Sequence, residues 1–204
     1  WRVDNTKSEI SLETGLPTCP VQRQRCSLGG AGNLVNNLAA LGCEGVEAFG
    51  VVGGDIWGRE IIDLLRNAGA GVDGIFVGGG EWSTLTYIKP HVGDEEQNRF
   101  DFGNFNTLEE QDALRLLNRI GQAMPSLDLL LVNEQVRQGI HTDLFREKLS
   151  SLIRRFPRKL VLVDSRHYSE AYPEAGLKVN EFEAVRRLGE TPDPNVAHAP
   201  RKQV

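Results

Sequence analysis

Apolar residues in this chain occur in two kinds of run. Short, nearly continuous runs are typical of strands covered on both faces; they occupy residues 46–52, 72–77, 127–132 and 159–163, with a shorter one at 177–180. Runs that repeat apolar residues every three or four positions are typical of amphipathic helices; they occupy residues 34–41, 56–68, 114–120, 144–153 and 181–188. Covered strands that alternate with amphipathic helices predict an α/β fold, in which helices layer a parallel sheet.

The helix expected after residue 106 has a recognisable start. Thr107 is followed three positions later by Glu110, which is the pattern of a capping box. This pattern predicts that the helix begins at Thr107 and that Leu114, Leu117 and Ile120 form its buried face.

Two β-rich segments interrupt the alternation of strands and helices, at residues 17–26 and 83–102. The second segment predicts a hairpin with strands at 83–89 and 97–102. Together the two segments predict a small separate sheet over one edge of the domain. Arg99 and Asp101 share one face of the hairpin strand, so they either reach a ligand beneath the hairpin or face water.

A glycine cluster, Gly29-Gly30-Ala31-Gly32-Asn33, opens the first predicted helix. The first amides of a helix have no intrahelical partner and carry partial positive charge, and glycine lets a ligand approach them closely. The side-chain amide of Asn33 both donates and accepts hydrogen bonds. The corner therefore suits a polyhydroxylated or anionic small molecule; the alternative is a plain tight turn. Neither a Walker A loop nor a GxGxxG fingerprint is present, which argues against a dinucleotide oxidoreductase.

Polar residues follow the predicted strands, where open α/β sheets bind their ligands. They occur at 53–55, 133–134, 164–166 and 180–183; the alternative is that they are solvated loop ends. Asn180 and Glu183 lie one helical turn apart, and oxygen ligands of this kind can hold Mg²⁺ through its waters. The guanidinium of Arg166 suits a phosphate, although an ion pair with Asp164 is the other interpretation.

Composition excludes several classes of function. The 204 residues carry a net charge of −5 without a long basic run, so nucleic acid is not an expected partner. No apolar run approaches the roughly 18 residues that span a bilayer, and no signal peptide is visible. Three cysteines without a CxxC favour reduced thiols and a cytoplasmic location. Because Trp1 is not a methionine, we expect that upstream sequence is missing.

Four motifs in order resemble the ribokinase-like (PfkB) carbohydrate kinase family. They are Gly29-Gly30-Ala31-Gly32-Asn33, Gly50-Val51-Val52-Gly53-Gly54-Asp55-Ile56-Trp57-Gly58, Leu160-Val161-Leu162-Val163-Asp164 and Asn180-Glu181-Phe182-Glu183-Ala184. Within the family, the extended lead-in at 8–11 and the strand at 99–102 resemble the heptose-7-phosphate kinase domain of bifunctional ADP-heptose synthases.

The resemblance implies a doubly wound, mostly parallel sheet with helices on both faces and a small β-sheet lid, formed by segments 17–26 and 83–102. It implies ATP-dependent phosphorylation of a sugar or sugar-phosphate hydroxyl with Mg²⁺, and a homodimer through the lid. The substrate-binding residues would be Gly29, Gly30, Asn33, Asp55, Arg99 and Asp101. The nucleotide- and phosphate-binding residues would be Asp164, Arg166, Asn180 and Glu183, with Glu183 on the metal.

The chain also departs from the family pattern. No Gly-Ala-Gly-Asp motif occurs in residues 1–204, so we assign no catalytic residue. The family's first strand and its C-terminal nucleotide-binding portion have no counterpart either, so residues 1–204 are expected to form one incomplete domain. Val35 and Gly54 replace residues that are usual in the family. These departures favour the alternative of a non-catalytic sugar-phosphate binder or regulator on the same fold.

Overall fold

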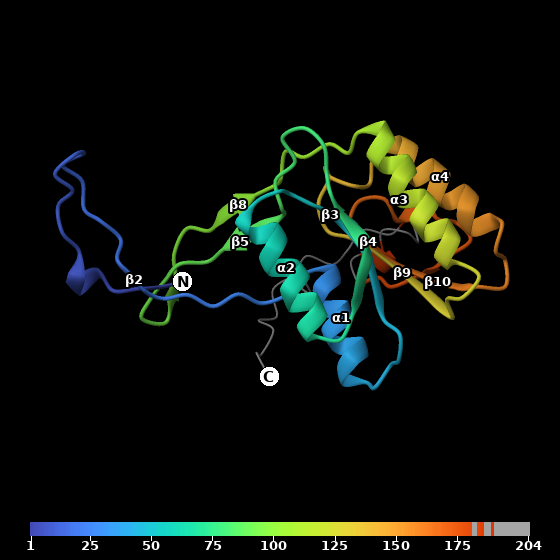
Figure 1. The fold of residues 1–204 in the computed structure, drawn as a ribbon, viewed down its shortest axis with the longest axis horizontal. Helices are drawn as coiled ribbons and strands as arrows, with labels where there is room; N and C mark the ends of the chain where they lie inside the picture. The colour runs from blue at the N-terminus through green and yellow to red at the C-terminus, as the bar shows by residue number, and fades with distance from the viewer. Residues whose placement is uncertain (181–182, 186–188, 190–204) are drawn as a thin grey trace.

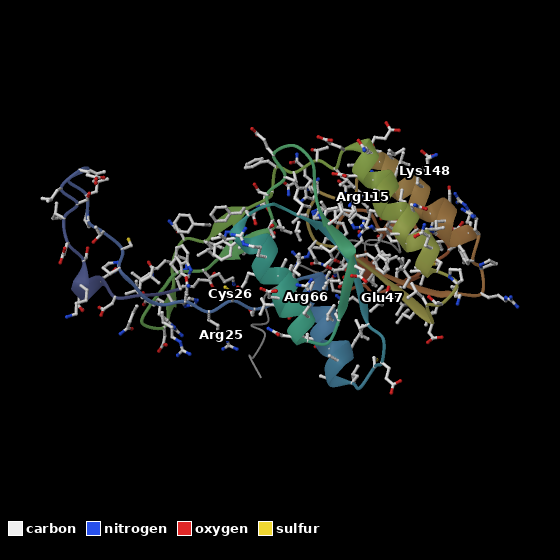
Figure 2. The ribbon with its side chains drawn as sticks, in the orientation of Figure 1. Arg25, Cys26, Glu47, Arg66, Arg115 and Lys148 are labelled. Atoms are coloured by element: carbon white, nitrogen blue, oxygen red, sulfur yellow. The ribbon has the colours of Figure 1, made fainter. Side chains whose placement is uncertain are left out.

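The structure is a computed structural model that describes residues 1–180, 183–185 and 189. A helix-and-sheet body occupies one end of the molecule, and the N-terminal segment extends from it as an arm (Figure 1). The α-helices are α1 (Ala31–Ala40), α2 (Ile56–Asn67), α3 (Glu110–Ala123) and α4 (Asp143–Arg154). Charged side chains such as Arg66 and Lys148 are exposed on α2 and α4 (Figure 2).

The parallel strands of the body form two groups. One group pairs β3 (Glu47–Val52) with β4 (Gly71–Val77). The other is ordered β11-β10-β9, with β9 at Leu129–Glu134, β10 at Leu160–Ser165 and β11 at Gly176–Leu177. β9 and β10 run in register from the pair Leu129 and Leu160 to the pair Glu134 and Ser165. The predicted α/β class is confirmed.

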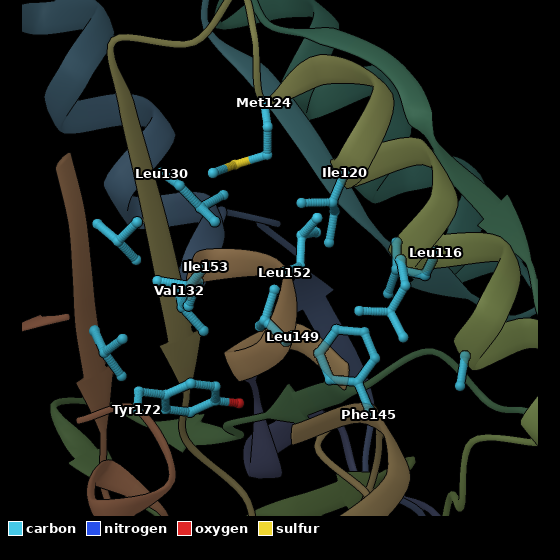
Figure 3. Packing of buried hydrophobic residues seen from close by; sticks show 14 of the residues in the cluster. Leu116, Ile120, Met124, Leu130, Val132, Phe145, Leu149, Leu152, Ile153 and Tyr172 are labelled. Atoms are coloured by element: carbon cyan, nitrogen blue, oxygen red, sulfur yellow. The ribbon is translucent and has the colours of Figure 1, made fainter. Parts of the chain in front are cut away.

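Helices cover both faces of these strands. On one face, α1 and α2 pack Val35 and Leu65 against the strand residues Ala48 and Ile75. On the other face, α3 and α4 form the larger core with β9 and β10; Leu116, Ile120, Phe145, Leu149 and Ile153 meet Leu130 and Val132 there (Figure 3). Burial of so many aliphatic side chains is the main stabilising contribution to the body.

The start of α3 differs from the prediction. Its N-cap is Glu109, without a side-chain cap, and the capping box at Thr107 does not form. The reason is a β-bridge between Thr107 and Gly139, in which the Leu108 N–H donates to the Gly139 carbonyl (3.2 Å). Leu117 and Ile120 are buried as predicted, whereas Leu114 is 46% exposed and Ala113 and Leu116 complete the buried face instead.

Short strands form two further sheets at the other end of the molecule. One is ordered β2-β1-β6-β7, with β1 at Arg2–Val3, β2 at Val21–Arg23, β6 at His91–Val92 and β7 at Glu95–Glu96. The other pairs β5 (Thr86–Ile88) with β8 (Phe100–Phe102), antiparallel as the hairpin pattern predicts. The connection between β5 and β8 itself carries the β6–β7 hairpin. These sheets contain the segments for which the family resemblance implies a lid.

A groove of about 1470 Å³ separates the two groups of parallel strands. Within the described residues, β3 pairs only with β4 and β9 pairs only with β10, so each has an edge without a neighbouring strand. Residues 49–52 and 129–133 line the two sides of the groove, and the start of α1 lines it as well. The groove therefore connects the apolar interior with the glycine corner.

Candidate functional site

The glycine corner forms the N-terminus of α1, as its sequence predicts. Gly30 is the N-cap and has φ +49° and ψ −124°, a backbone conformation that glycine adopts readily and other residues do not. A Cβ built on Gly30 would lie 3.6 Å from Asn133 Oδ1 and 4.0 Å from Gln135 Cγ. The corner therefore faces the carboxyl end of β9 across the groove.

The residues around Gly30 have different roles. Gly29 and Gly30 line the groove, whereas Asn33 is exposed on α1 and is not among the groove-lining residues. A Cβ on Gly32 would lie 2.9 Å from Leu28 Cβ, so this glycine permits close packing. Gln135 lines the groove beside Gly30 and was not predicted. The only sequence signal for it is its position one residue beyond the polar strand end at 133–134.

The carboxyl ends of β9 and β10 meet next to this corner. Asn133 Nδ2 donates to Asp164 Oδ2 (3.4 Å), and Lys178 Nζ donates to Asp164 Oδ1 (3.3 Å). Asp164 thus forms its ion pair with Lys178, and not with Arg166 as the sequence analysis gave as one interpretation. Arg166 lines the groove instead, and its backbone N–H donates to the carbonyl of Glu134, the residue between Asn133 and Gln135 (3.1 Å).

Asp55 joins the start of α2 to the loop before β5. It is the N-cap of α2, and its Oδ1 accepts from Gly58 N (2.7 Å) and from Thr84 Oγ1 (2.8 Å). Its Oδ2 accepts from Thr84 N (2.8 Å). Burial raises the pKa of Asp55, but the hydrogen bonds from Thr84 and Gly58 outweigh burial and place the pKa below its ordinary value of 3.8. The structure therefore shows Asp55 in a role that orders two loops.

Replacing Asp55 by asparagine is expected to lower the free energy of unfolding by about 1–2 kcal/mol at pH 7, since a charge-assisted cap is lost. A depressed pKa means that this contribution is present above pH 3.8 and is lost as the pH falls through the folded-state pKa. Urea unfolding of both proteins at pH 7 and at acidic pH measures the effect. If the difference in free energy of unfolding between the wild type and Asp55→Asn is the same at acidic pH as at pH 7, the Asp55 charge does not stabilise this cap.

Arg99 and Asp101 bind each other. Arg99 Nε and Nη2 donate to the two carboxylate oxygens of Asp101 (2.5 and 2.7 Å), and the guanidinium lies 4.3 Å from the centre of the Tyr87 ring. Asn104 Nδ2 also donates to Asp101 (3.2 Å). Of the pair, Arg99 lines the groove.

Asn180 and Glu183 form a reciprocal capping box. Asn180 N donates to Glu183 Oε2 (2.8 Å), and Glu183 N donates to Asn180 Oδ1 (2.9 Å). The predicted helix at 181–188 is described only at 183–185, where it is helical; residues 181–182 and 186–188 lie outside the described residues.

A polar cluster lies behind the strand ends and was not predicted. His141 Nδ1 lies 3.0 Å from the hydroxyl of the buried Tyr172. Arg146 donates to the His141 carbonyl, and its guanidinium lies 3.8 Å from the centre of the Tyr168 ring. These residues come from a loop, a helix and a 3-10 turn, so no local sequence pattern identifies them.

Among the described residues there is neither a candidate metal-binding cluster nor a membrane-spanning helix. No group of three or more histidine, cysteine, aspartate or glutamate side chains is arranged to hold a metal ion. Within the same part of the chain, every helix is too short or too polar to cross a membrane.

Comparison with known proteins finds relatives in sequence and neighbours in fold. No family model matches it. The bifunctional protein HldE of Gluconobacter oxydans is 32% identical over 187 residues, which are 89% of this chain and 38% of that protein. HldE of Chromohalobacter salexigens is 31% identical over 194 residues, 91% of this chain and 38% of that protein. The chain thus spans less than two fifths of the length of these relatives.

Solved structures share the fold at low identity. The tetrameric inhibited form of phosphofructokinase-2 from Escherichia coli has a TM-score of 0.64 at 19% identity, covering 96% of this chain and 62% of that one. Ribokinase from Thermotoga maritima has a TM-score of 0.59 at 16% identity, covering 93% of this chain and 59% of that one. These likenesses confirm what the sequence motifs indicate: the chain is related to the HldE bifunctional proteins and has the ribokinase-like fold of the PfkB sugar kinases.

Proposed function

We propose that this chain is the acceptor-binding part of a carbohydrate kinase that transfers the γ-phosphoryl group of ATP to a hydroxyl of a sugar or sugar phosphate. The observation that carries the proposal is that the Gly29-Gly30 corner faces Asn133 at the end of β9, while Arg166 lies in the turn after the neighbouring β10 and bonds to the residue next to Asn133. The corner offers helix amides, Asn133 offers an amide and Arg166 offers a fixed positive charge. This set suits a ligand with both hydroxyl and phosphate groups.

The proposed roles combine position with the family motifs. Gly29, Gly30 and Arg99 line the groove and bind the sugar, whereas Asn33 is assigned to the sugar by its motif alone. Asp55 and Asp101 act by ordering the loops around the sugar. Arg166 serves the phosphates from the groove, and Asp164, Asn180 and Glu183 are assigned to them by their motifs. Because phosphoryl transfer depends on positioning and charge stabilisation, these residues would contribute by holding the acceptor in line with ATP.

Mg²⁺ would neutralise charge on the phosphates when bound. The carboxylate of Glu183 and the side-chain amide oxygen of Asn180 are hard oxygen ligands of the kind that suit this ion. Glu183 Oε2 accepts from the backbone N–H of Asn180 (2.8 Å). Glu183 is therefore held in one orientation, as a residue that orders metal-bound water requires.

A cytoplasmic location and a homodimeric state are also proposed. Cys19, Cys26 and Cys43 are unpaired and exposed, which supports a reducing cytoplasm. Phe100 and Phe102 project from one face of β8 and are 55% and 42% exposed. An apolar lid face of this kind supports a homodimer through the lid, which sedimentation of the complete polypeptide would measure.

A phosphorylation assay of the complete polypeptide tests the function. ATP turnover is measured with a panel that includes heptose 7-phosphate, the acceptor of the kinases that the sequence resembles, and fructose 6-phosphate, the ligand in one phosphofructokinase-2 structure with this fold. Turnover with one sugar phosphate supports the kinase. Binding of a sugar phosphate without ATP turnover would instead support the non-catalytic binder.

Replacing Arg166 by methionine is expected to raise the KM for one phosphate-bearing substrate about ten-fold, since hydrogen bonds to a charged group contribute about 1.5–3 kcal/mol. Steady-state kinetics with ATP and with the sugar phosphate varied in turn would show which phosphate Arg166 binds. Arg158→Met is the matched control, because Arg158 is exposed and does not line the groove. If Arg166→Met and Arg158→Met have equal KM values, Arg166 does not bind a phosphate of either substrate.

A further inference from the structure

The side chain of Glu134 is completely buried at the carboxyl end of β9. Its Oε2 accepts from Ser165 Oγ (2.7 Å) and from His167 N (2.9 Å). Its backbone carbonyl accepts from Arg166 N (3.1 Å). Glu134 therefore binds three consecutive residues of the turn after β10, and the middle one is Arg166.

Among the described residues, the second carboxylate oxygen has no hydrogen-bond partner. Glu134 Oε1 and His167 Nδ1 are both buried without a hydrogen bond, and they lie 3.6 Å apart. Leaving such atoms unpaired is costly, and a hydrogen on Nδ1 would satisfy both of them if the two atoms approached by a few tenths of an ångström. His141, Tyr172 and Arg146 are the other titratable or charged groups close to this carboxylate.

We propose that Glu134 is the positioning residue that keeps Arg166 at the groove, with His167 held as the Nδ1–H tautomer against Glu134 Oε1. The proposal rests on the phosphate-binding role given to Arg166 above. With His167 in this tautomer, Ser165 Oγ, His167 N and His167 Nδ1 are three donors, and the two oxygens of a carboxylate can accept from all of them. Glutamine has one acceptor oxygen, and its amide group would face His167 Nδ1 as a donor.

The tautomer of His167 gives a test that is independent of activity. In ¹⁵N-labelled complete protein, the imidazole nitrogen shifts are expected to show Nδ1–H in the wild type and Nε2–H in Glu134→Gln, where the amide donates to Nδ1. The proposal is overturned if the wild type carries Nε2–H or if the substitution leaves the tautomer unchanged.

A double-mutant cycle tests the link to Arg166, with ATP binding to the complete protein measured by calorimetry. Glu134→Ala, which removes every side-chain acceptor from the turn, is expected to raise the Kd several-fold when Arg166 is present and to have no further effect in Arg166→Met. Glu147→Ala, on the exposed side of α4, is the matched control. If Glu134→Ala does not fold, Ser165→Ala removes one of the three donors and is expected to give a smaller effect in the same direction.

The outcomes separate this inference from the proposed function. Additive effects of Glu134→Ala and Arg166→Met, or no effect of Glu134→Ala while Arg166→Met weakens binding, would overturn the positioning role alone. No effect of Arg166→Met on the Kd for ATP, together with an unchanged KM for the sugar phosphate, would remove Arg166 from the phosphate site and overturn both statements about this turn.

Discussion

Replacing Gly30 by valine is expected to lower kcat/KM for sugar phosphorylation at least about 100-fold, the loss that a displacement of about 1 Å at a reacting group can cause. Gly30 has φ +49° and ψ −124°, so a valine is strained there at a cost of about 1–3 kcal/mol. Its Cβ would begin 3.6 Å from Asn133 Oδ1, and its methyl groups would enter the space between α1 and β9. Steady-state kinetics of the complete polypeptide with its sugar substrate would measure the loss.

Gly42 provides a matched control at the opposite end of α1. It also has a positive φ, +77°, but a Cβ there would meet no atom within 4 Å. Gly42→Val therefore imposes backbone strain on the same helix without filling the groove, and kcat/KM should stay near the wild-type value while the free energy of unfolding falls. If the two variants lose activity equally, strain in α1 and not occupation of the groove explains the loss.

The order and type of the main elements could be predicted because each depends on local patterns. The continuous apolar runs became β3, β4, β9 and β10, and the glycine corner became the start of α1. The start of α3 could not be predicted in this way. Thr107 has a local preference to cap a helix, but a bridge to Gly139, 32 positions away, holds its backbone in an extended form.

The candidate site was predicted where it depends on strand ends and was missed where it depends on tertiary pairing. The rule that ligands bind beyond the carboxyl ends of strands selected Asn133, Glu134 and Arg166. It could not show that Glu134 is buried and ties down the turn that holds Arg166. Nor could it show that Arg99 and Asp101 bind each other, because residues two apart on one strand can pair or diverge with equal ease.

The polar cluster behind the site has a consequence for stability. His141 packs edge-on against Phe145 and lies next to the Tyr172 hydroxyl, so its ring is withdrawn from water. Burial lowers the pKa of His141 to about 4 from its ordinary value of 6.5, against the opposing effect of the Glu134 charge. In the unfolded chain the same ring binds a proton near its ordinary pKa.

The free energy of unfolding should therefore fall as the pH is lowered from 6.5 to 4, because the unfolded state binds more protons over that range. The contribution of His141 should reach at most about 3 kcal/mol, at 1.36 kcal/mol for each unit of pKa difference. Urea unfolding between pH 7.5 and 4 should show a shallower pH dependence in His141→Asn than in the wild type. Tyr172→Phe should keep the wild-type pH dependence, because burial and not the Tyr172 hydroxyl is the main cause of the lowered His141 pKa. If His141→Asn has the same pH dependence as the wild type, another group is responsible for the loss of stability in acid.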